Sequence, residues 1–178
     1  MLRRRNHLCF AAAGGSIAGM AGRERSNGHG VVLDHVAKAI IEQLQEDGRR
    51  PYASIGKAVG LSEAAVRQRV QRLVDSGVIQ IVAVTDPLTV GFARQALVGI
   101  RVEGDIQAVA DTLAAMEEVD YLVITAGQYD ILAELVCEDD ARLFDLVNSR
   151  IRGIPGVRLT ETFVYLKLRK QTYTWGTR

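Results

Sequence analysis

A helical pattern that is cut into three short pieces, between residues 33 and 77, constrains this fold more than any other feature. In the first piece, residues 33–44 place their apolar side chains on one face of a helix, and Asp47-Gly48 ends it. The second piece begins near Pro51, because proline cannot lie inside a preceding helix. Helices this short bury their apolar faces only by packing against one another, so we expect a small three-helix domain over residues 31–78.

The third piece follows a glycine turn, Gly60-Leu61-Ser62, in which Ser62 is placed to cap a helix that ends at Gly77. Glu63 suits the positive end of that helix's dipole. The second helix is expected to bury Ile55, Ala58 and Val59, and the third Val66, Val70, Leu73 and Val74. Two short helices joined by a tight glycine turn, the second of them basic, are typical of a helix-turn-helix.

The outward face of the third helix carries the chemistry of DNA recognition. At about 100° per residue, this face holds Ala64, Gln68, Gln71 and Arg72, with Arg67 and Arg69 on the flanks. Arginine pairs with guanine and glutamine with adenine in the major groove, and small residues permit close approach. A helix that is merely kept soluble by Arg and Gln is the alternative. The predicted DNA-binding residues are Arg49, Arg50, Ser62, Ala64, Arg67, Gln68, Gln71 and Arg72.

The net charge of +1 conceals a strong segregation of charge along the chain. Residues 1–32 carry +4, residues 33–77 carry +1, residues 78–152 carry −8 and residues 153–178 carry +4. Clustered positive charge neutralises DNA phosphates and releases counterions. A charge run also fits a solvated surface, so the charges favour DNA binding only together with the helix-turn-helix.

The first thirty residues differ from the rest. Arg3, Arg4 and Arg5 precede an apolar run over residues 8–21, which imitates a secretory signal. The run is too short and too rich in Gly and Ala for a transmembrane helix, so we expect no membrane partner. We expect residues 1–30 to form a disordered leader, with Met20 as an alternative start.

Beyond Gly77 the pattern changes to strands. A β-prone run predicts a linking strand over residues 79–92. Strands are then expected at 96–102, 121–126, 131–136 and 157–168, with one helix capped by Asp105 and a second capped by Asp139 or Asp140. The order βαββαβ over residues 93–170 predicts a ferredoxin-like sheet with both helices on one face, and hence an α+β chain, with a tail at 171–178.

Three of these strands are apolar at both alternating positions, as in residues 97–100, 121–124 and 163–166. A sheet with two apolar faces needs two coverings, and the chain supplies helices for only one. A second subunit packed face to face is the favoured covering, and we expect a homodimer. The linking strand or the tail of the same chain is the alternative.

Catalytic and metal sites have little support. Cys9 and Cys137 are too few for a disulfide framework, and His7, His29 and His35 lie near the N-terminus with no ligand cluster around them. No Ser/His/Asp set, phosphate-binding glycine loop or close pair of candidate acids occurs where catalysis needs it. We expect no enzyme, no metal and no cofactor. A protein-interaction module that does not bind DNA is a further alternative. A test for salt-dependent DNA binding would distinguish it from a DNA-binding regulator.

The turn Gly127-Gln128-Tyr129-Asp130 offers backbone N–H groups and a carboxylate. An amino acid presents the complementary pair, a carboxylate and an ammonium group. From these residues alone, a hairpin turn whose Asp satisfies its own backbone is the stronger interpretation.

Several motifs together resemble one family. In the head they are Leu33-Asp34, Glu46-Asp47-Gly48-Arg49, Gly60-Leu61-Ser62 and the run from Val66 through Ser76-Gly77-Val78-Ile79; further on they are Gly127-Gln128-Tyr129-Asp130 and Ile154-Pro155-Gly156-Val157. With these motifs, residues 33–168 resemble the Lrp/AsnC (leucine-responsive, feast/famine) transcription factors. The position after Ser54, usually Leu, is Ile55, and Gly56 stands where Ala is common; we expect this glycine to loosen the second helix by about 1 kcal/mol.

The resemblance implies a winged helix-turn-helix that binds double-stranded DNA, and a ferredoxin-like domain that forms dimers and often octamers. It also implies an amino-acid effector, which would bind near Gly127, Gln128, Tyr129 and Asp130 between dimers. Such a regulator would control genes of amino-acid metabolism and would be cytoplasmic and associated with the nucleoid.

Overall fold

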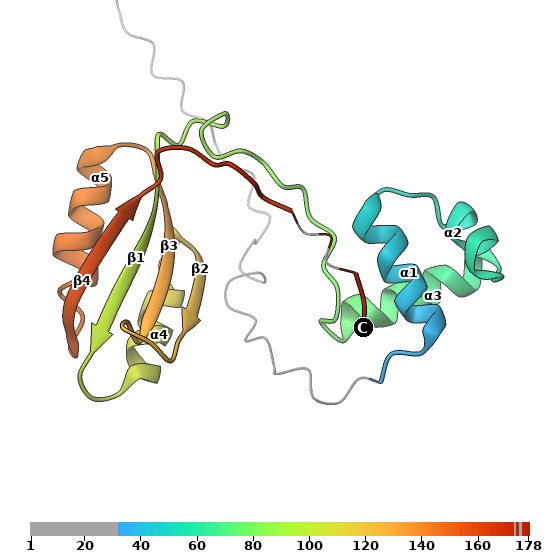
Figure 1. Cartoon of the computed structure of the whole chain (residues 1–178), viewed down its shortest axis with the longest axis horizontal. Helices are drawn as coiled ribbons and strands as arrows, with labels where there is room; N and C mark the ends of the chain where they lie inside the picture. Colours follow the sequence, from blue (N-terminus) through green and yellow to red (C-terminus); the bar gives the residue numbers. More distant parts are fainter. Residues whose placement is uncertain (1–31, 173, 175) are drawn as a thin grey trace, which may run out of the picture.

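The chain folds into a helical head and a sheet domain (Figure 1). Two segments run between them, the linker after α3 and the C-terminal tail. This computed structural model describes residues 32–172, 174 and 176–178, so the leader predicted over residues 1–30 lies outside the described residues. The head consists of α1 (His35–Glu46), α2 (Tyr52–Val59) and α3 (Glu63–Asp75). The predicted helix-turn-helix is therefore confirmed.

The caps of the head follow from its sequence. The Ser62 hydroxyl accepts a hydrogen bond from the Ala65 amide at 3.2 Å and begins α3, as predicted. Gly60 ends α2 with a φ of 73°, in the left-handed region that favours glycine. Asp34 caps α1, where its carboxylate accepts from the Ala37 amide at 2.7 Å. These caps fix the start of each long helix and the turn between α2 and α3.

One expectation for α2 is wrong. Ala58 is exposed, because it lies about 60° around the helix from the buried Ile55, on a side that stays open to solvent. Gly56 is buried against the turn before α3. A Cβ at Gly56 would lie 2.5 Å from the Leu61 carbonyl oxygen. The glycine therefore permits a close approach that alanine would obstruct.

The linking strand predicted over residues 79–92 is not formed, and no strand follows α3 until Arg94 in the described chain. A strand needs a neighbour that satisfies its backbone N–H and C=O groups, and the described residues of a single copy form no strand that pairs with this segment. The same reason applies to the strands of the wing that the resemblance implies. The segment crosses to the sheet domain without regular structure (Figure 1).

The sheet domain has the predicted βαββαβ order. It consists of β1 (Arg94–Val102), α4 (Ile106–Ala114), β2 (Val119–Ile124), β3 (Ile131–Cys137), α5 (Asp140–Asp145), a six-residue π-helix η1 (Leu146–Ile151) and β4 (Val157–Val164). The strands pair antiparallel in the order β2-β3-β1-β4, and both helical segments lie on one face (Figure 1). The ferredoxin-like fold is confirmed.

The ends of several elements differ from the expectation: β1 begins two residues earlier than predicted, β2 both begins and ends two residues earlier, and β3 ends one residue later. Strand β4 stops at Val164 rather than at Leu168, because beyond Val164 only the Tyr165 amide still donates a hydrogen bond to β1, to the Gln95 carbonyl at 2.9 Å. The second helix of the domain continues from α5 into the π-helix. In the π-helix the Arg152 amide bonds to the carbonyl of Val147, five residues earlier, at 3.1 Å.

The two faces of the sheet have different environments. The face under the helices buries the core side chains Ala96, Val98, Ile100, Ile131, Ala133 and Leu135. The other face, called the open face below, presents Tyr121, Leu159 and Phe163, which are 54%, 47% and 43% exposed. These three side chains therefore stay about half exposed in a single copy of the described chain. The prediction that the sheet has two apolar faces and only one covering is confirmed.

Candidate functional site

The outward face of α3 is open to solvent. Ala64, Gln68, Gln71 and Arg72 are all exposed, so the helical geometry brings the predicted base-reading residues together. Gln71 donates to the Asp75 carboxylate at 2.8 Å. Gln68 and Arg72 have no side-chain partner among the residues that the structure describes. Their amide and guanidinium groups are thus available to hydrogen-bond acceptors and donors outside the chain.

Arg67 is held on the flank of α3. Its Nη2 donates to the Glu63 carboxylate at 2.8 Å, and its guanidinium carbon lies 5.3 Å from the centroid of the Tyr52 ring. These contacts position Arg67 toward α2 rather than along the outward face. Sequence reasoning missed Tyr52, because nothing in the sequence pairs the first residue of α2 with the first turns of α3.

The loop between α1 and α2 holds the other two predicted arginines. Arg49 is exposed, and its side chain has no partner in the described part of the chain. Arg50 donates to the Gln43 amide oxygen at 2.5 Å and pairs with Glu46 at 3.1 Å, so it fastens this loop to α1. The Ser62 hydroxyl is occupied as a helix cap. Of these three residues, Arg49 is the one free to meet a phosphate.

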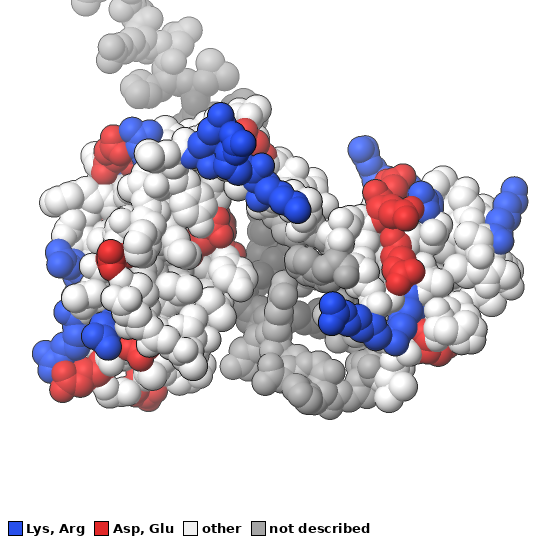
Figure 2. Space-filling model, in the orientation of Figure 1, with Lys and Arg blue, Asp and Glu red and all other residues white. Residues whose placement is uncertain are grey.

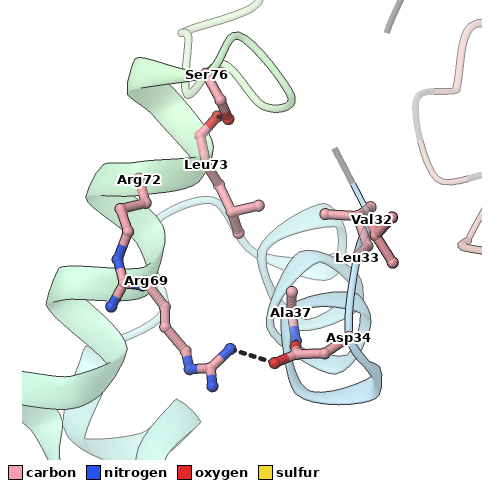
Figure 3. A pocket seen from close by; sticks show the side chains of 8 residues that line it. All are labelled: Val32, Leu33, Asp34, Ala37, Arg69, Arg72, Leu73 and Ser76. Atoms are coloured by element: carbon pink, nitrogen blue, oxygen red, sulfur yellow. Dashed lines mark hydrogen bonds and ion pairs between the residues drawn. The ribbon is translucent and has the colours of Figure 1, made fainter. Parts of the chain in front are cut away.

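A shallow pocket of about 310 Å³ lies between the start of α1 and the second half of α3 (Figure 3). Arg69 reaches across it, and its Nη1 lies 2.7 Å from the Asp34 carboxylate. The pKa of Asp34 is lowered, first by the hydrogen bond from the Ala37 amide and second by Arg69. This ion pair sets α3 against α1, and it was not predicted.

Asp130, in the predicted effector turn, supports a neighbouring strand. Its Oδ2 accepts a hydrogen bond from the Val102 amide at 2.8 Å, where the register of β1 with β4 shifts, and its amide donates to the Ile100 carbonyl at 2.9 Å. The alternative of a purely local turn is therefore incomplete, since Asp130 satisfies the backbone of β1. Its Oδ1 has no partner within the described chain.

Tyr129 packs on the open face. A Cβ at Gly99 would lie 2.7 Å from the Tyr129 ring, and the ring meets Phe163 edge-on with centroids 6.4 Å apart. Gly127 and Gln128 are exposed, and a Cβ at Gly127 would meet no described atom within 4 Å. Of the four predicted effector residues, Gly127 and Gln128 are therefore exposed, whereas Tyr129 and Asp130 are packed against the sheet.

A polar cluster marks one end of the open face. The Glu134 carboxylate accepts from the Gln95 side chain at 2.5 Å. Burial raises the pKa of Tyr165, and the charge and hydrogen bonding of Glu134 raise it further. The sequence did not single out these residues, because their strands meet only in the folded sheet.

Membrane and metal sites find no support in the residues described. No helix among them is long and apolar enough to cross a bilayer. Nor do these residues bring together three or more His, Cys, Asp or Glu side chains that could hold a metal ion. Cys137 is buried at the end of β3, and burial raises the pKa of its thiol.

Both domains match known family models. Residues 33–74 match the AsnC-type helix-turn-helix domain, and residues 92–178 match an AsnC-regulator model described as a C-terminal dimeric alpha+beta barrel domain. The HTH-type transcriptional regulator FL11 of Pyrococcus horikoshii is 35% identical over 144 residues, which are 80% of this chain and 95% of FL11.

Solved structures show the same arrangement. The leucine response regulatory protein LrpA of Mycobacterium tuberculosis is 28% identical, with a TM-score of 0.70 over 79% of this chain and 100% of LrpA. A transcriptional regulator of Neisseria meningitidis, solved in complex with L-Met, is 24% identical, with a TM-score of 0.69 over 80% of this chain and 96% of its own. The likeness therefore extends over the head and the sheet domain together.

Proposed function

Because this chain belongs to the Lrp/AsnC family of transcriptional regulators, we propose that it binds specific DNA sequences through α3 and that a bound amino acid changes its affinity for DNA. The observation that carries the first part is the exposed face of α3, on which Gln68 and Arg72 have no partner among the described residues. Unpaired amide and guanidinium groups on the second helix of a helix-turn-helix match the donor and acceptor pattern of the major groove.

Selection from a random-sequence pool tests this proposal. Duplexes enriched by the full chain are compared with shuffled duplexes of the same composition in a fluorescence-anisotropy titration at several salt concentrations. We expect tighter binding to the enriched duplex at every salt concentration, with both affinities falling as salt rises. Equal affinity for the enriched and shuffled duplexes would contradict sequence-specific binding. An affinity that does not change with salt concentration would favour the alternative of a protein-interaction module that does not bind DNA.

For the second part, we propose that the amino acid binds at Gly127-Gln128-Tyr129-Asp130 where dimers adjoin. The L-Met complex of the Neisseria meningitidis regulator supports an amino-acid ligand. The turn supports it as well: Gly127 leaves its backbone approachable, and the free Oδ1 of Asp130 could accept an ammonium group. Gln128 is exposed beside them, whereas Tyr129 would contribute a surface rather than a mobile side chain.

Thermal-shift measurements with the standard amino acids identify the ligand, since a ligand that binds only the folded state stabilises it. Asp130→Asn then removes the charge, while its amide oxygen can still accept from Val102. We expect this variant to lose the ligand-induced shift and to keep its own melting temperature. Asp145→Asn on α5, an exposed position, is the matched control. A full ligand shift in Asp130→Asn would place the ligand elsewhere.

We further propose that dimers assemble into octamers, and that the protein acts on chromosomal DNA in the cytoplasm, associated with the nucleoid, at genes of amino-acid metabolism. In this proposal the ligand and the assembly are linked, because a ligand held between dimers would favour one packing over another. Light scattering with and without the ligand measures the assembly.

A further inference from the structure

The C-terminal tail, residues 165–178, crosses from the sheet domain to the head (Figure 1). It leaves the sheet after the hydrogen bond from the Tyr165 amide to the Gln95 carbonyl. Its far end lies on α1, where the Gly176 amide donates to the Gln45 side chain at 3.1 Å and the Thr177 hydroxyl donates to Glu42 at 2.5 Å. The tail is thus held at both ends by its own uncharged groups, namely two backbone amides and one hydroxyl, and none of its cations takes part in these contacts.

The tail carries unpaired positive charge. Its sequence holds four basic residues and no acid. Lys167, Arg169 and Lys170 are exposed and form no ion pair with any residue in the described ranges, whereas Arg50 and Arg67 of the head each pair with a glutamate. In Figure 2 basic side chains gather over the segment that crosses between the two domains. These charges therefore do not serve to hold the chain's own fold together.

We propose that Lys167, Arg169 and Lys170 form a second DNA-contacting element, which binds phosphates of the duplex that α3 reads. This inference rests on the proposed function. A duplex carries one negative charge per roughly 1.7 Å of its length, so unpaired cations tethered to the head meet phosphates beyond the site of α3. Fastening both ends of the tail lowers the entropy lost on binding, because its position is largely set beforehand.

Phosphate contacts carry no sequence information, and this separates the tail from α3. Full-length Arg169→Gln/Lys170→Gln is compared with Arg152→Gln/Arg158→Gln, which removes the same charge from the surface of the sheet domain. The probes are the enriched duplex and its shuffled counterpart. We expect the tail variant to reduce the slope of log K against log salt by about 1.8 for each protomer bound to the duplex, at about 0.9 per phosphate contact. Its affinity for both duplexes should fall by the same factor, and the control should keep the wild-type slope.

An unchanged slope in the tail variant would overturn the inference, and so would an equal reduction in the control. The alternative binding partner for the basic tail is the acidic block of residues 78–152 on a second copy of the chain, which carries a charge of −8. A tail variant that changes the molar mass in sedimentation but keeps the slope would assign the tail to that contact and overturn DNA binding. A reduced slope in a protein that does not distinguish the two duplexes would support the tail and contradict the proposed specificity of α3.

Discussion

Gln68 separates base reading from charge, because its side chain is neutral, exposed and without a partner among the described residues. We predict that Gln68→Ala lowers the discrimination between the enriched and shuffled duplexes by about 1–3 kcal/mol, the worth of a good bidentate base contact. Binding to the shuffled duplex and its salt slope should not change. Gln107→Ala on α4 is the matched control, and anisotropy titrations measure both. Undiminished discrimination in Gln68→Ala would mean that another face of the head reads DNA.

Gly56 gives a test of stability at the residue scale. A methyl group there would lie 2.5 Å from the Leu61 carbonyl oxygen, whereas at Gly48 the nearest described atoms are 3.7 and 3.9 Å away. We predict that Gly56→Ala destabilises the head by about 1–3 kcal/mol, as overpacking does. Gly48→Ala should be neutral or better. Urea denaturation followed by circular dichroism compares them, and a Gly56→Ala variant as stable as Gly48→Ala would show that the turn can move aside.

At the scale of elements, the ion pair of Asp34 and Arg69 links α1 to α3 and gives a prediction about pH. The pKa of Asp34 lies below its ordinary value of 3.8, so the stabilisation is complete above that pH and is lost as pH falls through the lowered pKa. Arg69→Gln should raise this pKa toward 3.8 without fully restoring it, because the Ala37 amide still donates. Carbon NMR of the Asp34 carboxyl group measures the shift. Arg72→Gln, in the same pocket, should leave the pKa of Asp34 unchanged. If the pKa of Asp34 is also unchanged in Arg69→Gln, the proposed ion pair between α1 and α3 is refuted.

The elements that the sequence predicts well are those set by local chemistry. Ser62, Asp105 and Asp139 each cap a helix at the expected position, because the capping side chain and the amide it bonds to lie within three residues of each other. The strand over 79–92 fails for the opposite reason, since a strand depends on a distant partner. The site divides in the same way. Helical periodicity predicts the face of α3, but it cannot predict that Arg67 lies over Tyr52, a contact between two helices.

At the scale of the whole molecule, residues 92–178 match a domain model described as dimeric, and the open face is the apolar surface on which we place that dimer contact. Phe163 lies on this face opposite Leu97 and beside Tyr129, and it is 43% exposed. Phe144 on α5 is 68% exposed on the helical side of the domain. Phe163→Glu and Phe144→Glu are therefore matched changes on opposite sides of one sheet.

We predict that Phe163→Glu dissociates the dimer and that Phe144→Glu does not. A symmetric interface contains each substitution twice. Phe163 is 43% exposed in one copy, so covering the rest of it is worth about 1 kcal/mol, and losing this twice raises the dissociation constant by roughly tenfold or more. Each buried glutamate adds an uncompensated charge. The Phe163→Glu monomer should also bind the enriched duplex more weakly, because two linked heads bind with a higher effective concentration than one. Analytical ultracentrifugation and anisotropy measure the two effects, and circular dichroism checks that both variants fold. Monomers from Phe144→Glu alone would move the interface to the helical side, and the open face would then need another covering.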